Sequence, residues 1–562
     1  MESGRFLTSA LLALGLAGGA LAQQAPSPPT VTPPAEYSQR FLAAGSWFHG
    51  VHGLAFNKDD QLFAGSVIGQ TLYHVQVDSG EVDRVVEPPT GMANDIAFAD
   101  DGTMAWTALL LGKVYIRKPN GKIIEVANGL SGPGPLAFSK EGRLYVSEVI
   151  LGDALYEVDI KNADKPDFKP AGRGELRRIA EKLGGLGGFE VHRDDGFLYG
   201  PLRSKGQAVK INLENGAVDV IAAGFTEPLA ANLDPQNRDN LYVVDATTGN
   251  VWSISLTSKA KRLVATLRSG LDNLAFDSRG RLFVTAMADN GIYLVDKQTG
   301  AAKAIVEGKL AVPGDLAVVT ENGRETLHVA DFFSYRTIDG ASGAVTDALR
   351  MHGELHSYPA GISIGPKHVL LTSWFSGSVE KVDRKTGHVV ASLGNFAVPV
   401  DAIETADGTV LVAEAGSGNL VRISADGKTR STLAKDLRGP VALVQGPGTI
   451  AYITEKTAGA IAQIDTGSGA RKVVADGLSG PEGIDVGPDG KLFVAEVGQK
   501  RVVVVDAASG AKTVIASNLE IGLPSYPGGP PATVPTGVAV AKSGAVYVSS
   551  NVRNAIYKLT PP

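Results

Sequence analysis

The chain has 562 residues, of which 44% are hydrophobic and 20% charged, a composition that fits a folded globular protein and excludes general disorder. The formal net charge of −6 argues against a nucleic-acid partner, because phosphate contacts require a basic face. The absence of cysteine excludes disulfides, thiolate metal sites and cysteine nucleophiles.

The N-terminus is typical of an export signal. Arg5 provides the charged start, residues 6–18 form an apolar core, and the small residues at 20–22 predict cleavage, so residues 1–22 are expected to be a signal peptide. Residues 23–37 are proline-rich and predict an extended linker. No later stretch reaches ~18 uninterrupted apolar residues, so no membrane span is expected. We therefore expect a secreted or periplasmic protein.

One short pattern recurs twelve times after residue 50. Each copy has a small or acidic residue, an apolar triplet, an Asp/Gly turn and a strand such as LYV, as in HGLAFNKDDQLFAGSV from His52. Most copies begin about 40–46 residues apart, and a unit of this length with three or four short strands is typical of one propeller blade.

The repeats predict an all-β fold of about twelve four-stranded blades, arranged as two six-bladed β-propellers in tandem. We place the first at residues 38–309 and the second at 310–562; a five-plus-seven division is the alternative. The last copy is one strand short, so either residues 38–46 or the segment before the seventh blade must complete a ring. The best helical pattern is at 175–183, and the insertion at 516–535 is either a lid or a spacer.

Acidic and amide side chains recur where inner strands start and second strands end, two sets of positions that face the same channel mouth of a propeller. Clusters of oxygen ligands suit Ca²⁺, which takes 6–8 of them. We therefore predict a divalent cation at a channel mouth, with the candidate ligands Asn94, Asp272, Asn273, Asp245 and Glu482. The alternative is that an acid at a strand end hydrogen-bonds the neighbouring blade.

A histidine at a channel mouth can act as a general base near neutral pH. His52 is the preferred candidate because it occupies a strand start, and His356 is the second. The carboxylates of Asp272 and Glu148 are the other candidates for activating water. Aromatic residues gather in blades seven and eight, where they form either a recognition surface or core: Phe332, Phe333, Tyr358, Trp374 and Phe375.

The blades resemble the SMP-30/gluconolactonase family of calcium-dependent six-bladed propellers, within the NHL-type group. The likeness is strongest in HGLAFNKDDQLFAGSV, DNLAFDSRGRLFV and GPEGIDVGPDGKLFVAEVGQKRVVVVD. In that family a Glu, an Asn and an Asp that open inner strands bind the ion. Asn94, Asp272 and Glu482 are similar to such positions, whereas His52 stands where the family has its first Glu. The segment AYITEKTAGAIAQID also resembles the repeats of virginiamycin B lyase.

The resemblance implies an exported, calcium-dependent lactonase or esterase that acts on a small cyclic or linear ester. A Ca²⁺ ion at the mouth would polarise the carbonyl, and His52, Asp272 or Glu148 would activate water. The first ring is the better candidate because it combines histidine, asparagine and acids. Two alternatives stay open: a non-catalytic NHL-type propeller that binds a partner protein, and a lyase that opens a cyclic ester.

Overall fold

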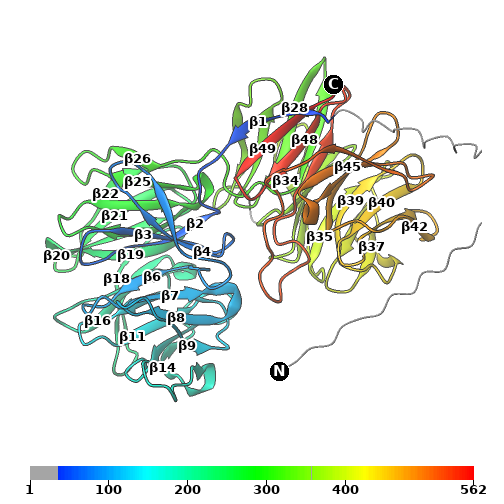
Figure 1. The fold of residues 1–562 in the computed structure, drawn as a ribbon. Helices are drawn as coiled ribbons and strands as arrows, with labels where there is room; N and C mark the ends of the chain where they lie inside the picture. The colour runs from blue at the N-terminus through cyan, green and yellow to red at the C-terminus, as the bar shows by residue number, and fades with distance from the viewer. Residues whose placement is uncertain (1–35, 356) are drawn as a thin grey trace, which may run out of the picture. The chain divides into compact units, whose positions relative to one another are not determined.

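The computed structural model describes residues 36–355 and 357–562. The expected signal peptide, most of the expected linker and His356 lie outside the described residues. Within the described ranges the chain forms twelve β-sheets (Figure 1). Its helical residues there are confined to short 3-10 turns: η1 (Leu109–Leu111), η2 (Arg173–Glu175), η3 (Arg203–Lys205), η4 (Met287–Asp289) and η5 (Val497–Gln499). The prediction of an all-β propeller protein built from four-stranded blades is confirmed. In these ranges we find no helix with the length and apolarity that a membrane crossing needs.

Six sheets follow one another between residues 51 and 306, and we call them the first ring. The first strand of each sheet packs against the first strand of the next, and β2 also packs against β23, which closes the ring. Sheet by sheet, the strands are β2 (Val51–Phe56), β3 (Leu62–Ser66), β4 (Thr71–Val75), β5 (Val82–Val86); β6 (Ile96–Phe98), β7 (Met104–Ala108), β8 (Lys113–Arg117), β9 (Ile123–Asn128), with β13 (Ala171–Gly172) added beside β9; β10 (Pro133–Phe138), β11 (Leu144–Glu148), β12 (Ala154–Val158), β14 (Arg177–Glu181); β15 (Glu190–Val191), β16 (Phe197–Leu202), β17 (Gln207–Asn212), β18 (Val218–Ala223); β19 (Pro228–Asp234), β20 (Asn237–Asp245), β21 (Asn250–Ser255), β22 (Lys261–Thr266); and β23 (Leu271–Phe276), β24 (Leu282–Ala286), β25 (Gly291–Val295), β26 (Ala302–Val306).

The other six sheets form the second ring, which closes through packing of β27 against β47. Its strands are β27 (Leu316–Glu321), β28 (Arg324–Asp331), β29 (Ser334–Asp339), β30 (Val345–Arg350); β31 (Gly361–Ile364), β32 (His368–Ser373), β33 (Ser378–Asp383), β34 (Val389–Leu393); β35 (Pro399–Glu404), β36 (Val410–Glu414), β37 (Asn419–Ile423), β38 (Arg430–Ala434); β39 (Pro440–Gln445), β40 (Ile450–Glu455), β41 (Ala460–Asp465), β42 (Arg471–Ala475); β43 (Pro481–Val486), β44 (Leu492–Glu496), β45 (Arg501–Val505), β46 (Lys512–Ala516); and β47 (Val538–Val540), β48 (Val546–Ser550), β49 (Ala555–Thr560), β1 (Ser38–Ala44).

The second strand of a sheet is the most apolar because it is covered on both faces. All five residues of β24 and all five of β44 are buried. Their side chains pack against the neighbouring sheets on either side, which is why these strands are continuous hydrophobic runs and not alternating ones.

The strand that the last repeat lacks comes from the start of the described chain. β1 pairs antiparallel with β49, from Ser38 opposite Thr560 to Ala44 opposite Ala555. Residues 38–44 therefore belong to the last sheet of the second ring, which corrects the domain boundary expected at residue 38. β1 covers the edge of β49 and completes a four-stranded sheet from the two ends of the described residues.

The segment at 175–183, which has the best helical pattern in a sequence with almost no helical periodicity, is a turn and a strand. Residues Arg173–Glu175 form η2, and Arg177–Glu181 form β14, which pairs with β12 as the outer strand of its sheet. Pairing in the sheet satisfies the backbone groups of β12 and so overrides a short helical preference.

The insertion at 516–535 packs against both rings. Gln70 of the first ring donates from Nε2 to Pro524 O at 2.8 Å, and Trp374 of the second donates from Nε1 to Thr533 O at 2.7 Å. Asn551 accepts from the backbone N–H groups of Gly522 and Leu523. The insertion is therefore tied down at several points along its length.

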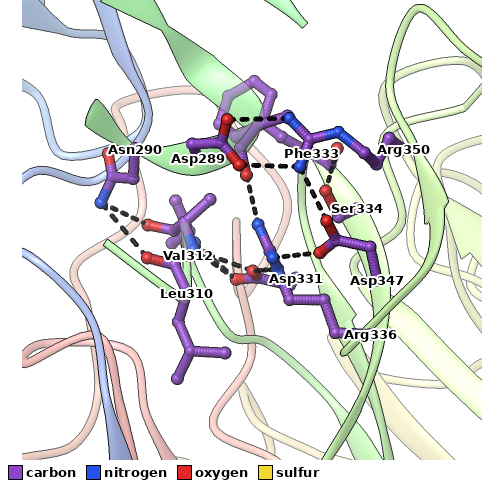
Figure 2. A network of polar contacts seen from close by, with 12 residues as sticks. Asp289, Asn290, Leu310, Val312, Asp331, Phe333, Ser334, Arg336, Asp347 and Arg350 are labelled. Atoms are coloured by element: carbon purple, nitrogen blue, oxygen red, sulfur yellow. Dashed lines mark hydrogen bonds and ion pairs between the residues drawn. The ribbon is translucent and has the colours of Figure 1, made fainter. Parts of the chain in front are cut away.

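The two rings are joined by a buried network of charged groups (Figure 2). Arg336 is 3% exposed and bonds the carboxylates of Asp331 and Asp347, and it also donates to the backbone oxygen of Ala288 in the first ring. Arg350 makes two bonds to Asp289 of the first ring, at 2.7 and 3.0 Å. A buried guanidinium with several acceptors fixes the geometry of the groups around it.

We expect Leu42→Ala to lower the free energy of unfolding by about 2–5 kcal/mol, because Leu42 of β1 is buried among β27, β28 and β48. Urea melts of the purified protein measure the change. Ser38→Ala, at the exposed start of the same strand, is the control and should change stability by less than about 0.5 kcal/mol. Equal effects of the two substitutions would contradict a structural role for β1.

We expect Arg336→Met to cost about 3–5 kcal/mol in urea melts, because it leaves the buried carboxylates of Asp331 and Asp347 without this cation. The matched control is Arg324→Met. Arg324 is 75% exposed and pairs with Asp339, so its loss should change stability by at most about 1 kcal/mol. An Arg336→Met variant with an unchanged free energy of unfolding would show that this network does not hold the two rings together.

Candidate functional site

A cavity of about 360 Å³ lies at the mouth of the first ring. One residue from the start of each inner strand lines it: His52, Asn94, Pro135, Gly187, Leu229 and Asp272. The expectation that strand starts surround one mouth therefore holds in this ring. The cavity also has an exposed rim, since the lining residue Ile150 is 43% exposed and the side chain of Arg203 is 46% exposed.

Aromatic residues of the second ring form another wall of this cavity. Phe332, Phe333, Tyr358 and Phe375 all line it, and Phe333 is only 1% exposed. Their rings make edge and tilted contacts at centroid distances of 4.9–5.9 Å. Residues of the first ring, including Met287, pack into the same cluster. These aromatic residues are thus largely buried and also line a cavity. The sequence left open whether they form core or a recognition surface, and the structure shows that they pack in a core cluster at the edge of a cavity.

His52 and Asp272, two of the predicted catalytic residues, are in contact. His52 Nδ1 lies 3.1 Å from Asp272 Oδ2, and the side chains are 11% and 18% exposed. The imidazole meets Phe333 edge-on at 5.5 Å, and Thr285 Oγ1 donates to the backbone oxygen of His52. Aspartate on Nδ1 fixes the tautomer and leaves Nε2 as the basic nitrogen.

A second histidine–carboxylate pair contributes to the cavity from both rings. His352 of the second ring places Nδ1 2.7 Å from Glu227 Oε2 of the first. Arg203 donates from Nε to Glu227 Oε1 at 2.7 Å, and Thr247 Oγ1 donates to Oε2 at 2.8 Å. Burial acts to raise the pKa of Glu227, but the hydrogen bond and charge of His352 and the charge of Arg203 lower it to about 2.

No sequence pattern selected Glu227 and Arg203 as candidates. Both are isolated charged residues outside the recurring acid positions, and their partner His352 is 125 residues away from Glu227 along the chain. His352 stands in the connection between β30 and β31, near the second-choice candidate His356, which lies outside the described residues. Only the packing of one ring on the other unites these groups.

Of the other predicted residues, Asn94 lines the cavity but Asn273 does not. Asn273 Nδ2 donates to Asp95 Oδ1 at 2.8 Å, and both residues line a separate hollow of about 450 Å³. Burial raises the pKa of Asp95 to about 7, against hydrogen bonds that lower it.

Glu148, Asp245 and Glu482 are engaged elsewhere. Glu148 accepts from Ser131 N and from Arg173 Nε at 2.7 and 2.6 Å, and Asp245 accepts from the backbone N–H groups of Thr226 and Glu227. Glu482 belongs to the second ring, where it holds Lys456 Nζ at 2.6 Å and Thr536 N at 2.6 Å. None of the three lines the cavity, because each carboxylate turns back to bind nearby donors.

The strand-end acids share this bracing function along the chain. In six sheets the acid that ends the second strand accepts a backbone N–H from the loop before its own inner strand: Glu148, Asp245, Asp331, Glu414, Glu455 and Glu496. Loop N–H groups that would otherwise be unpaired gain a partner, which is the structural alternative left open by the sequence.

The donor set at the cavity does not fit Ca²⁺. Of the five predicted ligands only Asn94 and Asp272 line it, and Asp272 Oδ2 already bonds His52. Across residues 36–355 and 357–562, no three His, Cys, Asp or Glu side chains are grouped so that they could hold a metal ion. Calcium prefers 6–8 oxygen ligands, so we derive no chemical step through a metal.

Three buried carboxylates stand in alternate sheets of the second ring. Asp315, Asp401 and Asp485 accept backbone N–H bonds from Ile362, Leu443 and Val540 of the next sheet, respectively. Burial raises the pKa of all three, to about 7 for Asp315 and about 6 for Asp485. The folded protein therefore favours the protonated acids.

No family model matches the chain, and no curated protein matches it. Among solved structures, a virginiamycin B lyase from Staphylococcus aureus is similar at 14% identity and a TM-score of 0.37, over 52% of this chain and 96% of the lyase. The extracellular domain described as that of a hybrid two component system, BT4673 from B. thetaiotaomicron, is similar at 10% identity and a TM-score of 0.33, over 94% of this chain and 83% of that domain. These scores carry no argument about activity, and membership of the SMP-30/gluconolactonase family stays a prediction.

We expect the contribution of Asp485 to the stability of the protein to fall as the pH rises from about 4 to about 6. Its pKa is raised on folding, so its contribution is complete below pH 4 and is lost as the pH passes the folded value. In this window Asp485→Asn should make the fall of the unfolding free energy with rising pH less steep, by up to about 1.4 kcal/mol per pH unit. Urea melts at several pH values measure this slope. An unchanged slope would contradict the buried, protonated carboxyl.

Proposed function

We propose that the cavity is a catalytic site that hydrolyses an ester or lactone bond of a small, largely apolar molecule. The observation that carries the proposal is the His52–Asp272 pair, held at the mouth of the first ring beneath aromatic residues of the second. A histidine whose orientation is fixed by a carboxylate, next to a small apolar cavity, is the arrangement that general-base catalysis needs.

The proposed step uses the chain's own groups. Asp272 accepts the Nδ1 proton of His52, and no described residue bonds His52 Nε2. Nε2 takes a proton from water as the water oxygen attacks the carbonyl carbon. The carbon–oxygen bond to the leaving alcohol then breaks, and Nε2 returns the proton to that alcohol. Arg203 and Asn94 are lining side chains that can donate hydrogen bonds to the oxygens of the ester.

The choice of an ester or lactone is supported by the resemblance of the repeats to SMP-30/gluconolactonase blades. The apolar wall favours substrates with a hydrocarbon or aromatic body over sugars, since burying unpaired hydroxyl groups against Phe332, Phe333 and Phe375 is unfavourable. The signal-like N-terminus supports action outside the cytoplasm. Dihydrocoumarin, an aromatic lactone, is a suitable first substrate.

We expect His52→Gln to lower the hydrolysis rate of dihydrocoumarin by about 10²–10⁴-fold, because the general base is lost. The matched control is His74→Gln. His74 lies in β4 of the same sheet and faces Asp83 at 4.0 Å, but it does not line the cavity, so this variant should retain the wild-type rate. Absorbance and product mass are followed for both variants and for a panel of aliphatic esters and lactones.

The outcomes separate the alternatives. Hydrolysis adds the mass of one water, whereas a lyase reaction does not. Turnover that EDTA abolishes and Ca²⁺ restores would support the calcium enzyme of the family resemblance and contradict the metal-free step. Binding of dihydrocoumarin without turnover of any panel member would contradict catalysis and leave the binding propeller.

A further inference from the structure

The first ring gives the cavity an aliphatic wall. In its first three sheets the residues that directly follow the second strand line the cavity, two from each sheet: Val67, Ile68, Leu109, Leu110, Val149 and Ile150. We call these six residues the aliphatic wall. Their side chains carry no polar atom, so a ligand gains binding energy from them only by covering them with an apolar part of its own.

The aliphatic wall reaches the surface of the protein at the third sheet. Val67, Ile68 and Leu109 are buried, whereas Ile150 is 43% exposed and the next residue, Leu151, is 86% exposed. Within residues 36–355 and 357–562, no other large hydrophobic residue is as exposed as Leu151. Single exposed apolar residues are common on proteins, but an exposed pair that continues the lining of a cavity is typical of a ligand groove. We call Ile150 and Leu151 the apolar rim.

The loop between β11 and β12 carries the apolar rim and is held at both ends. At its start, Val149 N donates to Gly132 O at 3.1 Å. At its end, the Asp153 carboxylate accepts the backbone N–H groups of Gly184 and Gly185 at 2.8 and 3.0 Å. A loop that is already ordered loses little conformational entropy when a ligand binds to it. The apolar rim is therefore a preformed surface.

The size of the cavity indicates why a ligand would reach the apolar rim. Its volume of about 360 Å³ is near the lower end of the ~300–1,000 Å³ that ligand pockets have. A ligand whose polar group lies at His52 and Asp272 fills this space with the first part of its apolar body, and a longer body must leave the cavity. Arg203 at the mouth is charged and bonds Glu227, so an apolar body gains more by leaving over Ile150.

We propose that the substrates carry an unbranched hydrocarbon chain, of which the near part lies on the aliphatic wall and the far part on the apolar rim. Rotation about its single bonds lets such a chain follow the wall out of the cavity, which a rigid ring system cannot do. The ester or lactone bond of these substrates rests on the proposed function, whereas the site for the chain rests on the wall and the rim alone. The cavity therefore selects aliphatic esters by the length of their chain.

The test uses methyl ketones, which keep the carbonyl group of an ester but cannot be hydrolysed. Binding of 2-pentanone, 2-heptanone, 2-nonanone and 2-undecanone to the protein is measured by calorimetry. We expect the affinity of the wild type to rise about two- to fourfold with each added methylene, because each one buries apolar surface. Leu151→Asp should keep the rise from 2-pentanone to 2-heptanone and remove the rise from 2-nonanone to 2-undecanone, since only the far end of the chain reaches the rim.

Leu263→Asp is the matched control. Leu263 is an exposed leucine of the first ring, in the outer strand β22, and it does not line the cavity. This variant should keep the whole ketone series. With methyl butanoate and methyl decanoate as substrates, Leu151→Asp should lower kcat/KM for the decanoate by about tenfold and change that for the butanoate by less than about twofold. Thermal melts show that each variant is folded, and Leu151→Ser replaces Leu151→Asp if the charge prevents folding.

The results separate the site for the chain from the proposed hydrolysis. A wild-type affinity that does not rise with chain length, or a rise that Leu151→Asp leaves unchanged, would overturn this site even if His52→Gln abolishes turnover. A rise that depends on Leu151 in a protein that hydrolyses no ester would support the site and contradict hydrolysis. Binding to phosphatidylcholine vesicles that Leu151→Asp abolishes, with an unchanged ketone series, would assign the rim to a lipid surface and overturn the proposal.

Discussion

The buried guanidinium of Arg336 is the interaction on which the geometry between the rings depends. A guanidinium that is almost fully removed from water needs acceptors for its donors, and Arg336 finds them in Asp331, Asp347 and the backbone of Ala288. Asp331 in turn accepts the backbone N–H groups of Ala311 and Val312 in the connection between the rings. The connection, the second ring and the first ring are thus joined through one cation.

The cavity is a consequence of that junction. The first ring supplies the circle of strand starts with His52 and Asp272, and the second ring supplies the aromatic wall and His352. In the second ring, Glu482 at one strand start accepts hydrogen bonds from Thr536 N at the next strand start and from Lys456 Nζ. The two rings therefore share a repeat but use the equivalent positions differently, one to surround a cavity and the other to bind its own chain.

The environment of each carboxylate, and not its place in the repeat, sets its chemistry. Glu227 has three donors and a pKa of about 2, whereas Asp315 has backbone donors and no cation, and burial raises its pKa to about 7. Asp272 contacts the imidazole of His52. The neighbouring donors and cations therefore decide whether a carboxylate is a brace, a buried acid or part of a reactive pair.

Much of the fold could be predicted because each blade is a local unit. The repeat length, the Asp/Gly turns and the continuous apolar second strands determine four-stranded sheets, and the position of His52 and Asp272 at strand starts places both at the first-ring mouth. The choice among the acids failed for Glu148, Asp245 and Glu482, because their sequence positions cannot show that a loop N–H or a lysine already occupies each carboxylate. The sequence by itself determined the blades and the mouth residues. Only the tertiary structure decided that β1 completes the last sheet and that His352 contacts Glu227. No local sequence pattern relates these residues, because β1 and β49 lie at opposite ends of the described residues and His352 and Glu227 are 125 positions apart.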